Sequence, residues 1–299
     1  MQKIASVAAA LSLLAVLAPA AHAATTVPYN TLTGNAPLVI GHRGAPAYLP
    51  ENTIGGNELA ARMGSDYIET DVMMTADKVL IAMHDLTLTR TTNVAQVYAP
   101  RNGGYAVEDF TYAELQALTV QPTGSGDWTY PGFAPADADP YRIPTFADML
   151  DALTDYNAAN GTNVGMLTEG KYAYDAATNR AVIETLIERG YDSPEKSIVQ
   201  SFDFANVSEY AALLAEHGVD MGVAQLGGGN LIGDQWFIGT TASFETLAGY
   251  TDTVALYYQS ITEGLIKAAH DLNLSVFAWT FRPIRANLRV RRAASVRDS

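Results

Sequence analysis

The stretch "PLVIGHRGAPAYLPENTIGGNELAARMGSDYIETDV", residues 37–72, contains the pattern that best indicates the fold class. An apolar run at 37–41 is followed by a segment rich in helix-forming residues at 53–63, and a strand-like run follows at 67–72. Two apolar strands joined through a helix are typical of a parallel βαβ unit. The stretch therefore predicts an α/β fold with a parallel sheet.

The same alternation continues along the chain. Strand-like runs are expected at 79–83, 164–167, 197–200, 219–224, 253–257 and 274–279, and helices at 146–159, 175–189, 205–217 and 261–271. The simplest fold with this rhythm is a single (β/α)8 TIM-type barrel, to which we assign residues 24–299. A segment at about 91–141, after the third strand-like run, is too long for a connection and is expected to be an insertion that caps one barrel end. A second long loop is expected from Gly227 onward.

The first 23 residues have the pattern of a secretory signal peptide. A basic start with Lys3 precedes an apolar run at 4–17, and the small residues of Ala21-His22-Ala23 suit a cleavage site. An uncleaved membrane anchor is the alternative, although the run is shorter than the roughly 20 residues that span a bilayer. We therefore expect a periplasmic or secreted bacterial protein with no stable membrane insertion after signal cleavage. The chain has no cysteine, so disulfides cannot stabilise it.

The net charge of −14 bears on the partners of the protein. An acidic surface repels nucleic acids and anionic membranes, so we expect no nucleic-acid partner. An anionic small molecule can still bind where local cations or a metal ion reverse the sign of the field.

Two carboxylates lie two residues apart in "YIETDV". On a strand, Glu69 and Asp71 point to the same face, where burial is costly unless a cation joins them. A solvent-facing acidic pair on an edge strand is the alternative.

The next apolar run, at 79–83, begins too soon after this strand for a parallel crossover. It is therefore expected to return antiparallel through a turn at 75–78. With Ala76 and Asp77 as the central turn residues, His84 would lie directly across from Glu69.

A third carboxylate follows the strand-like run at 164–167. Glu169 ends this run and Lys171 stands two residues later, where barrel enzymes place functional groups. An ordinary surface ion pair between the two is the alternative. Together with Glu69 and Asp71, Glu169 would form a hard oxygen site suited to Ca²⁺ or Mg²⁺ rather than to zinc.

Other residues add the means to bind phosphate and to move protons. Arg43 offers a planar fork for a phosphate group and Lys171 a point charge. His42 and His84 can act as general acid and base near neutral pH. Together with a metal, these groups suit the cleavage of a phosphodiester. Two aromatic residues, Phe202 and Trp279, end strand-like runs and either line a pocket or pack in the core.

The motifs in this order resemble the glycerophosphodiester phosphodiesterase family, over about residues 37–282. The matching segments are "HRG" (42–44), "PENT" (50–53), "ETD" (69–71), "HD" (84–85), "RTT" (90–92), "EGK" (169–171), "QSF" (200–202) and "WT" (279–280). The insertion after "RTT" is similar to one in the periplasmic branch of the family. Gly170 is a small departure, because the family usually has another apolar or small residue between the Glu and the Lys.

The resemblance implies a (β/α)8 barrel that hydrolyses glycerophosphodiesters to glycerol 3-phosphate and an alcohol. It implies further that His42 and His84 are the acid/base pair, without deciding which is the acid. The positions that it implies for metal ligands are Glu69, Asp71 and Glu169, and those for substrate binding are Arg43, Lys171, Phe202 and Trp279. The secreted branch is associated with Ca²⁺, which ranks above Mg²⁺ as the expected cofactor.

The C-terminal segment departs from the family pattern. After "WT" the family continues through a helix to a final strand, whereas residues 282–299 contain six of the 18 basic residues of the chain. A truncated or frame-shifted reading is our hypothesis, and a basic amphipathic helix at 287–296 is the alternative. A missing final strand would leave an open sheet edge.

Two other functions are alternatives to the one implied. A related barrel phosphodiesterase could act on lysophospholipids or phosphoinositides. A barrel made inactive by its C-terminus could act as a binding protein.

Overall fold

The computed structural model describes residues 29–123, 130–171 and 173–281. The expected signal peptide, residues 1–23, and the basic tail, residues 282–299, lie outside the described residues. Of the helices in the described ranges, none has the length and apolar character required to cross a membrane.

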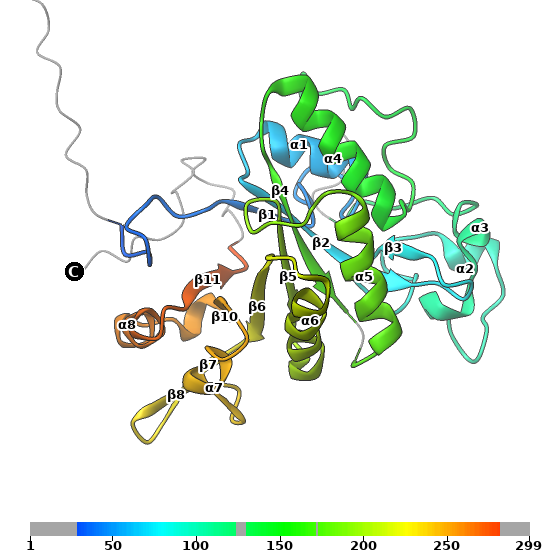
Figure 1. Cartoon of the computed structure of the whole chain (residues 1–299). Helices are drawn as coiled ribbons and strands as arrows, with labels where there is room; N and C mark the ends of the chain where they lie inside the picture. Colours follow the sequence, from blue (N-terminus) through cyan, green and yellow to red (C-terminus); the bar gives the residue numbers. More distant parts are fainter. Residues whose placement is uncertain (1–28, 124–129, 172, 282–299) are drawn as a thin grey trace, which may run out of the picture.

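Seven parallel strands form one curled sheet (Figure 1). Their order is β1 (Ile40–His42), β2 (Tyr67–Met74), β4 (Gly165–Gly170), β5 (Ser197–Ser201), β6 (Gly222–Gly227), β10 (Thr253–Tyr257) and β11 (Ser275–Trp279). The prediction of an α/β fold with a parallel sheet is confirmed. Within the described ranges, β1 and β11 end the sheet and do not pair with each other, so this part of the chain forms a half-open barrel.

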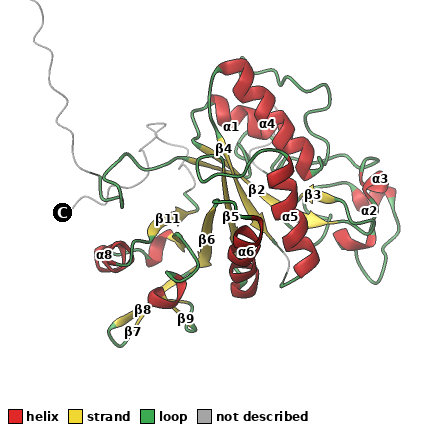
Figure 2. Cartoon of the chain, viewed as in Figure 1, coloured by secondary structure: helices red, strands yellow, loops and turns green. Residues whose placement is uncertain are grey.

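Helices cover the outer face of this sheet (Figure 2). They are α1 (Ile54–Arg62), α4 (Phe146–Asn160), α5 (Ala176–Glu188), α6 (Phe204–His217) and α8 (Glu263–Asp271). Ile68 and Val72 of β2 pack in the core cluster with α1, α4, α5 and α6. Tyr67 of β2 and Leu167 of β4 belong to the cluster of the opposite face. Because side chains alternate along a strand, Glu69, Asp71 and Glu169 also point to this inner face.

The short strand β3 (Leu80–Ala82) returns antiparallel to β2, as predicted, but the predicted register is wrong by one residue. Val72 pairs with Ala82, and the Thr75 N–H donates to the Val79 carbonyl oxygen at 3.0 Å. The loop therefore has three residues instead of two. Its last residue, Lys78, has φ 64°, the left-handed conformation typical of three-residue hairpin loops. His84 consequently follows the end of β3 and does not lie directly across from Glu69.

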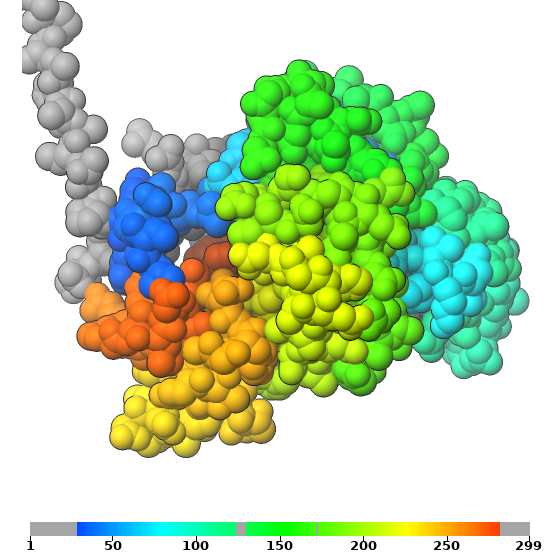
Figure 3. Space-filling view, in the orientation of Figure 1, coloured from blue at the N-terminus to red at the C-terminus, as the bar shows by residue number. Residues whose placement is uncertain are grey.

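The described residues between β3 and α4 form a lobe with a small core (Figure 3, cyan to green, right). This insertion lobe contains α2 (Val94–Val97), the 3-10 helix η1 (Val107–Asp109) and α3 (Tyr112–Leu115). Phe110 and Leu115 are fully buried and share a cluster with Met73 of β2 and Ile81 of β3. The insertion lobe is thus fastened to the β2–β3 hairpin, next to the C-terminal end of β2.

The long loop expected from Gly227 is instead a second, three-stranded antiparallel sheet. It comprises β7 (Gly229–Ile232), β8 (Gln235–Ile238) and β9 (Ala242–Ser243), and α7 (Phe244–Leu247) follows. Gly233, with φ 65°, and Asp234 form the two-residue turn between β7 and β8, which suits a hairpin. The 3-10 helix η2 (Tyr258–Ser260) follows β10.

Candidate active site

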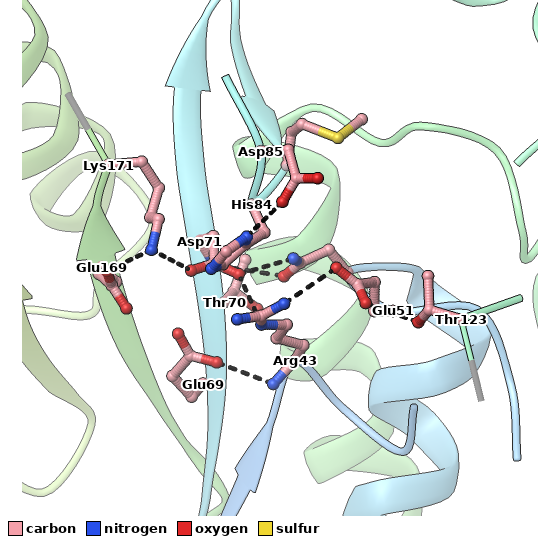
Figure 4. Close-up of polar contacts among 12 residues, drawn as sticks. Arg43, Glu51, Glu69, Thr70, Asp71, His84, Asp85, Thr123, Glu169 and Lys171 are labelled. Atoms are coloured by element: carbon pink, nitrogen blue, oxygen red, sulfur yellow. Dashed lines mark hydrogen bonds and ion pairs between the residues drawn. The ribbon is translucent and has the colours of Figure 1, made fainter. Parts of the chain in front are cut away.

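Three buried carboxylates meet on the inner face of two adjacent strands (Figure 4). Asp71 of β2 pairs directly with Glu169 of β4, and Glu69 lies two residues before Asp71. One ligand oxygen from each of the three lies within 4.8 Å of the other two. The structure thus brings together the three residues expected to bind a metal, and the alternative of a solvent-facing acidic pair is wrong, because Asp71 is fully buried and Glu69 is 2% exposed.

The electrostatics of this acidic triad (Glu69, Asp71 and Glu169) indicate a site for a cation. Oε1 of Glu69 and Oδ1 of Asp71 are buried without a hydrogen-bond partner, which is costly for a carboxylate. Burial and the charges of Asp71 and Glu169 raise the pKa of Glu69 well above its usual range. Burial and the charge of Asp71 also raise the pKa of Glu169, to about 7. Three carboxylates with buried oxygens that accept no hydrogen bond fit a hard divalent cation.

The loop after β1 presents Arg43 to this triad in an uncommon backbone conformation. Arg43 has φ 56°, and its backbone N–H donates to Oε2 of Glu69 at 2.8 Å. Its guanidinium donates from Nη1 to Glu51 at 3.2 Å, and Nε lies 3.4 Å from Oδ2 of Asp71. The next residue, Gly44, has φ 82°, and a Cβ there would lie 2.7 Å from Oδ1 of Asn57 and from the backbone of Gly56. The "HRG" turn therefore requires its glycine.

Lys171 lies between two of the carboxylates. Its Nζ is 2.5 Å from Oε1 of Glu169 and 3.5 Å from Oδ1 of Asp71. Burial lowers the pKa of this ammonium, but the charges of Asp71 and Glu169 outweigh burial and raise the pKa above its usual range. Since Lys171 is 13% exposed, its contact with Glu169 belongs to the site and is not an ordinary surface ion pair.

Gly170, which separates Glu169 from Lys171, is explained by packing. A Cβ at this position would collide with the hydroxyl of Tyr210 in α6, which is fully buried. The departure from the family pattern is thus matched by a large neighbour that fills the same space.

The two histidines approach the triad from different elements. His42 ends β1 and pairs with Glu69 of β2, while His84 follows β3. Burial and, secondly, the charge of Arg43 lower the pKa of His42 to about 4. Burial also lowers the pKa of His84, although the charge of Asp71 and the hydrogen bond with Asp85 oppose this shift. Both imidazoles are therefore neutral at pH 7 in the absence of a ligand.

The two aromatic residues lie at the mouth of the site, at the ends of β5 and β11. The rings of Phe202 and Trp279 are 5.4 Å apart in an edge-to-face arrangement. Nζ of Lys171 is 5.9 Å from the Phe202 ring centroid. Lys171 and Phe202 line an open cavity of about 300 Å³. Phe202 is 48% exposed and does not pack in the core, whereas Trp279 is partly buried and donates to the Ala255 carbonyl oxygen.

Sequence reasoning assigned no role to several residues that hold the site together. Asn52 donates to Oδ2 of Asp71 at 2.8 Å and accepts from the Asp71 N–H at 3.2 Å. Arg90 binds both Glu51 and Asp85. These residues belong to the "PENT", "HD" and "RTT" segments. The segments indicate the family, but they do not show which side chains these residues contact.

The model of the glycerophosphoryl diester phosphodiesterase family matches residues 42–294. The chain belongs to this family.

Individual relatives agree with this membership. The glycerophosphodiester phosphodiesterase of Haemophilus influenzae is 33% identical over 66% of this chain, which spans 58% of the length of that enzyme. The Bacillus subtilis protein YhdW is 30% identical over 81% of this chain and 85% of its own length.

Solved structures show the same fold. A protein from Silicibacter pomeroyi DSS-3 has a TM-score of 0.64 at 26% identity and covers 85% of this chain and 87% of its own. A phosphodiesterase from Oleispira antarctica, solved with its product sn-glycerol-3-phosphate, has a TM-score of 0.61 at 21% identity. The match covers 84% of this chain and 87% of that protein's chain.

Proposed function

We propose that the protein is a metal-dependent enzyme that hydrolyses glycerophosphodiesters to glycerol 3-phosphate and an alcohol. The observation that carries the proposal is the acidic triad, in which two buried oxygens accept no hydrogen bond, beside Arg43 and Lys171. Carboxylates for a cation next to groups that bind anions suit a phosphodiester, which must be held by its charge. Membership of the family and the names of its relatives support the same activity.

The acidic triad would hold the metal ion. Three carboxylates are ligands that both Ca²⁺ and Mg²⁺ accept, and we propose Ca²⁺ because the resemblance is to the secreted branch of the family. When bound, such a cation polarises a phosphoryl oxygen and neutralises charge that develops on it.

Arg43 and Lys171 would bind the phosphate oxygens. Both cations are already oriented by carboxylates, Arg43 by Glu51 and Asp71 and Lys171 by Glu169 and Asp71. Side chains held in this way lose little further entropy when the substrate binds. Phe202 and Trp279, at the mouth, would contact the organic part of the diester.

The two histidines would exchange protons with the attacking and leaving oxygens. His42 suits the base, because its low pKa keeps the imidazole neutral and able to accept a proton. His84 suits the acid, because the carboxylate of Asp85, 2.6 Å from Nδ1, stabilises the protonated ring. Neutral His84 would first take up a proton on Nε2 in the complex with the anionic substrate and would then give that proton to the leaving oxygen.

The test is hydrolysis of glycerophosphocholine by the purified chain and its histidine variants. His42→Ala and His84→Ala should each reduce turnover by about 10²–10⁴-fold, the usual contribution of a general acid or base. His270→Ala, in the last turn of α8, is the matched control and should keep its activity. A His42→Ala or His84→Ala variant with the activity of the wild type would refute the assignment.

Chelation tests the metal. Excess chelator should abolish hydrolysis, and Ca²⁺ should restore it more fully than Mg²⁺. Full activity in excess chelator would contradict a catalytic metal. A substrate panel with lysophospholipids and glycerophosphoinositol would measure the breadth of the specificity.

We also propose that the protein is exported to the periplasm or secreted, on the strength of residues 1–23 alone. Expression in a bacterial host followed by cell fractionation tests this. Recovery of an uncleaved chain in the cytoplasm would contradict it.

A further inference from the structure

Asp85 is fully engaged between a histidine and an arginine. Its Oδ1 lies 2.6 Å from Nδ1 of His84. Arg90 donates from Nε to Oδ2 of Asp85 at 2.6 Å and from Nη2 to Oδ1 at 2.8 Å. An ionised carboxylate with two such partners has a fixed plane and cannot rotate away from the imidazole. The same pairing holds the pKa of Asp85 at about 2, chiefly through the bonds from Arg90, so the group is ionised at neutral pH.

Arg90 is held on its far side by a second carboxylate. Its Nη2 donates to Oε1 of Glu51 at 2.7 Å and its Nη1 to Oε2 at 3.0 Å. Glu51 is 6% exposed and also accepts from Thr123 at 2.6 Å and from Arg43 at 3.2 Å. Figure 4 shows the Glu51 carboxylate between Arg43 and Thr123. Glu51 therefore links the arginine that supports Asp85 to the arginine proposed to bind phosphate.

We propose that Glu51, Arg90 and Asp85 are positioning residues that select one tautomer of His84. A carboxylate only accepts hydrogen bonds, so the proton of neutral His84 must lie on Nδ1, where it is donated to Asp85. Nε2 then carries the free lone pair and is the atom that exchanges protons with a substrate. This inference rests on the proposed function for the role of Nε2, but the choice of tautomer does not depend on it.

A purely structural role is the competing explanation, because Arg90 stands at the start of the insertion lobe and could serve only to fasten it. Arg101 provides a matched control within the same lobe. Its side chain is 37% exposed, against 38% for Arg90, and its guanidinium binds both carboxylate oxygens of Glu114. Replacing either arginine removes a two-pronged ion pair from the lobe, but only Arg90 contacts Asp85.

The kinetic arm compares Arg90→Gln with Arg101→Gln in the full chain, with glycerophosphocholine and Ca²⁺. Arg90→Gln should reduce kcat by about 10–100-fold, the usual cost of losing a residue that orients a catalytic group, and should change KM by less than about threefold. Arg101→Gln should leave both constants close to those of the wild type. Equal effects of the two substitutions on kcat would overturn the proposal.

The second arm needs no activity. In the metal-free chain labelled with ¹⁵N-histidine at pH 8, the ring nitrogens of His84 should show a proton on Nδ1, with the signals assigned through His84→Gln. Arg90→Gln and Asp85→Asn should weaken this preference, and Arg101→Gln should preserve it. A proton on Nε2 in the wild type, or no change in Arg90→Gln, would overturn the proposal. If the chain hydrolyses no glycerophosphodiester but passes this arm, the proposed function fails alone.

Discussion

Asn52 should be among the most sensitive positions for stability. Its side-chain amide forms two reciprocal bonds with Asp71, one to Oδ2 at 2.8 Å and one from the backbone N–H at 3.2 Å. Asn52 is 3% exposed and has φ 54°, a left-handed conformation that Asn tolerates better than most residues. The perturbation is Asn52→Ala.

Three losses contribute to the expected change. A hydrogen bond to a charged group contributes about 1.5–3 kcal/mol, and the buried Asp71 N–H left without a partner costs about 1–3 kcal/mol. An alanine in the left-handed region adds about 1 kcal/mol. Asn52→Ala should therefore lower the free energy of unfolding by about 3.5–7 kcal/mol, a large part of the usual 5–15 kcal/mol.

Urea denaturation in the presence of a chelator measures this change, because a bound metal would add its own contribution to stability. Asn52→Gly should lose about 1 kcal/mol less, since glycine adopts positive φ without strain. Asn273→Ala is the control, because Asn273 has φ 61° but lies after α8, so it should show the backbone cost alone. If Asn52→Ala lost no more stability than Asn273→Ala, the reasoning about Asp71 would be refuted.

Two further predictions concern acid stability and packing. The pKa of Glu51, usually 4.5, falls to about 2 because the bonds from Arg90 and Thr123 outweigh burial, and that of Asp85 falls from 3.8 to about 2. Lowered carboxyl pKa values stabilise the fold above about pH 4.5, and this contribution is lost as the pH falls towards 2. The stability difference between wild type and Arg90→Gln, measured in urea, should thus shrink between pH 6 and pH 2.5; a constant difference would contradict the assignment. Gly170→Ala should cost about 1–3 kcal/mol by overpacking against the hydroxyl on α6. The second substitution Tyr210→Phe, which removes the hydroxyl, should restore part of the lost stability. If the effects of the two substitutions were fully additive, the predicted collision would be contradicted.

Local pattern was enough to predict much of the fold. The strand-like runs at 67–72 and 253–257 and the helix at 205–217 correspond to β2, β10 and α6 within a few residues. The shared face of Glu69 and Asp71 also follows from the alternation of a single strand. These properties depend on neighbours in sequence, which is why the sequence indicates them.

Two predictions about strands failed, one on the register of β3 and one on the segment from Gly227 onward. The register of β3 was wrong because Lys78 adopts a left-handed conformation, for which lysine gives no sequence signal. The sheet of β7, β8 and β9 was missed because its strands are short, at most four residues each, and too short to show an alternating pattern.

The alternation of strands and helices, the family and the candidate catalytic residues could all be predicted from the sequence. Which of these residues touch could be seen only in the folded structure. Asp71 meets Glu169 across two strands, Asn52 reaches Asp71 from the loop after β1, and Arg90 joins Glu51 to Asp85. The physical reason is that these contacts join residues far apart in the chain, so their geometry is set by strand register and loop conformation, which no local pattern specifies.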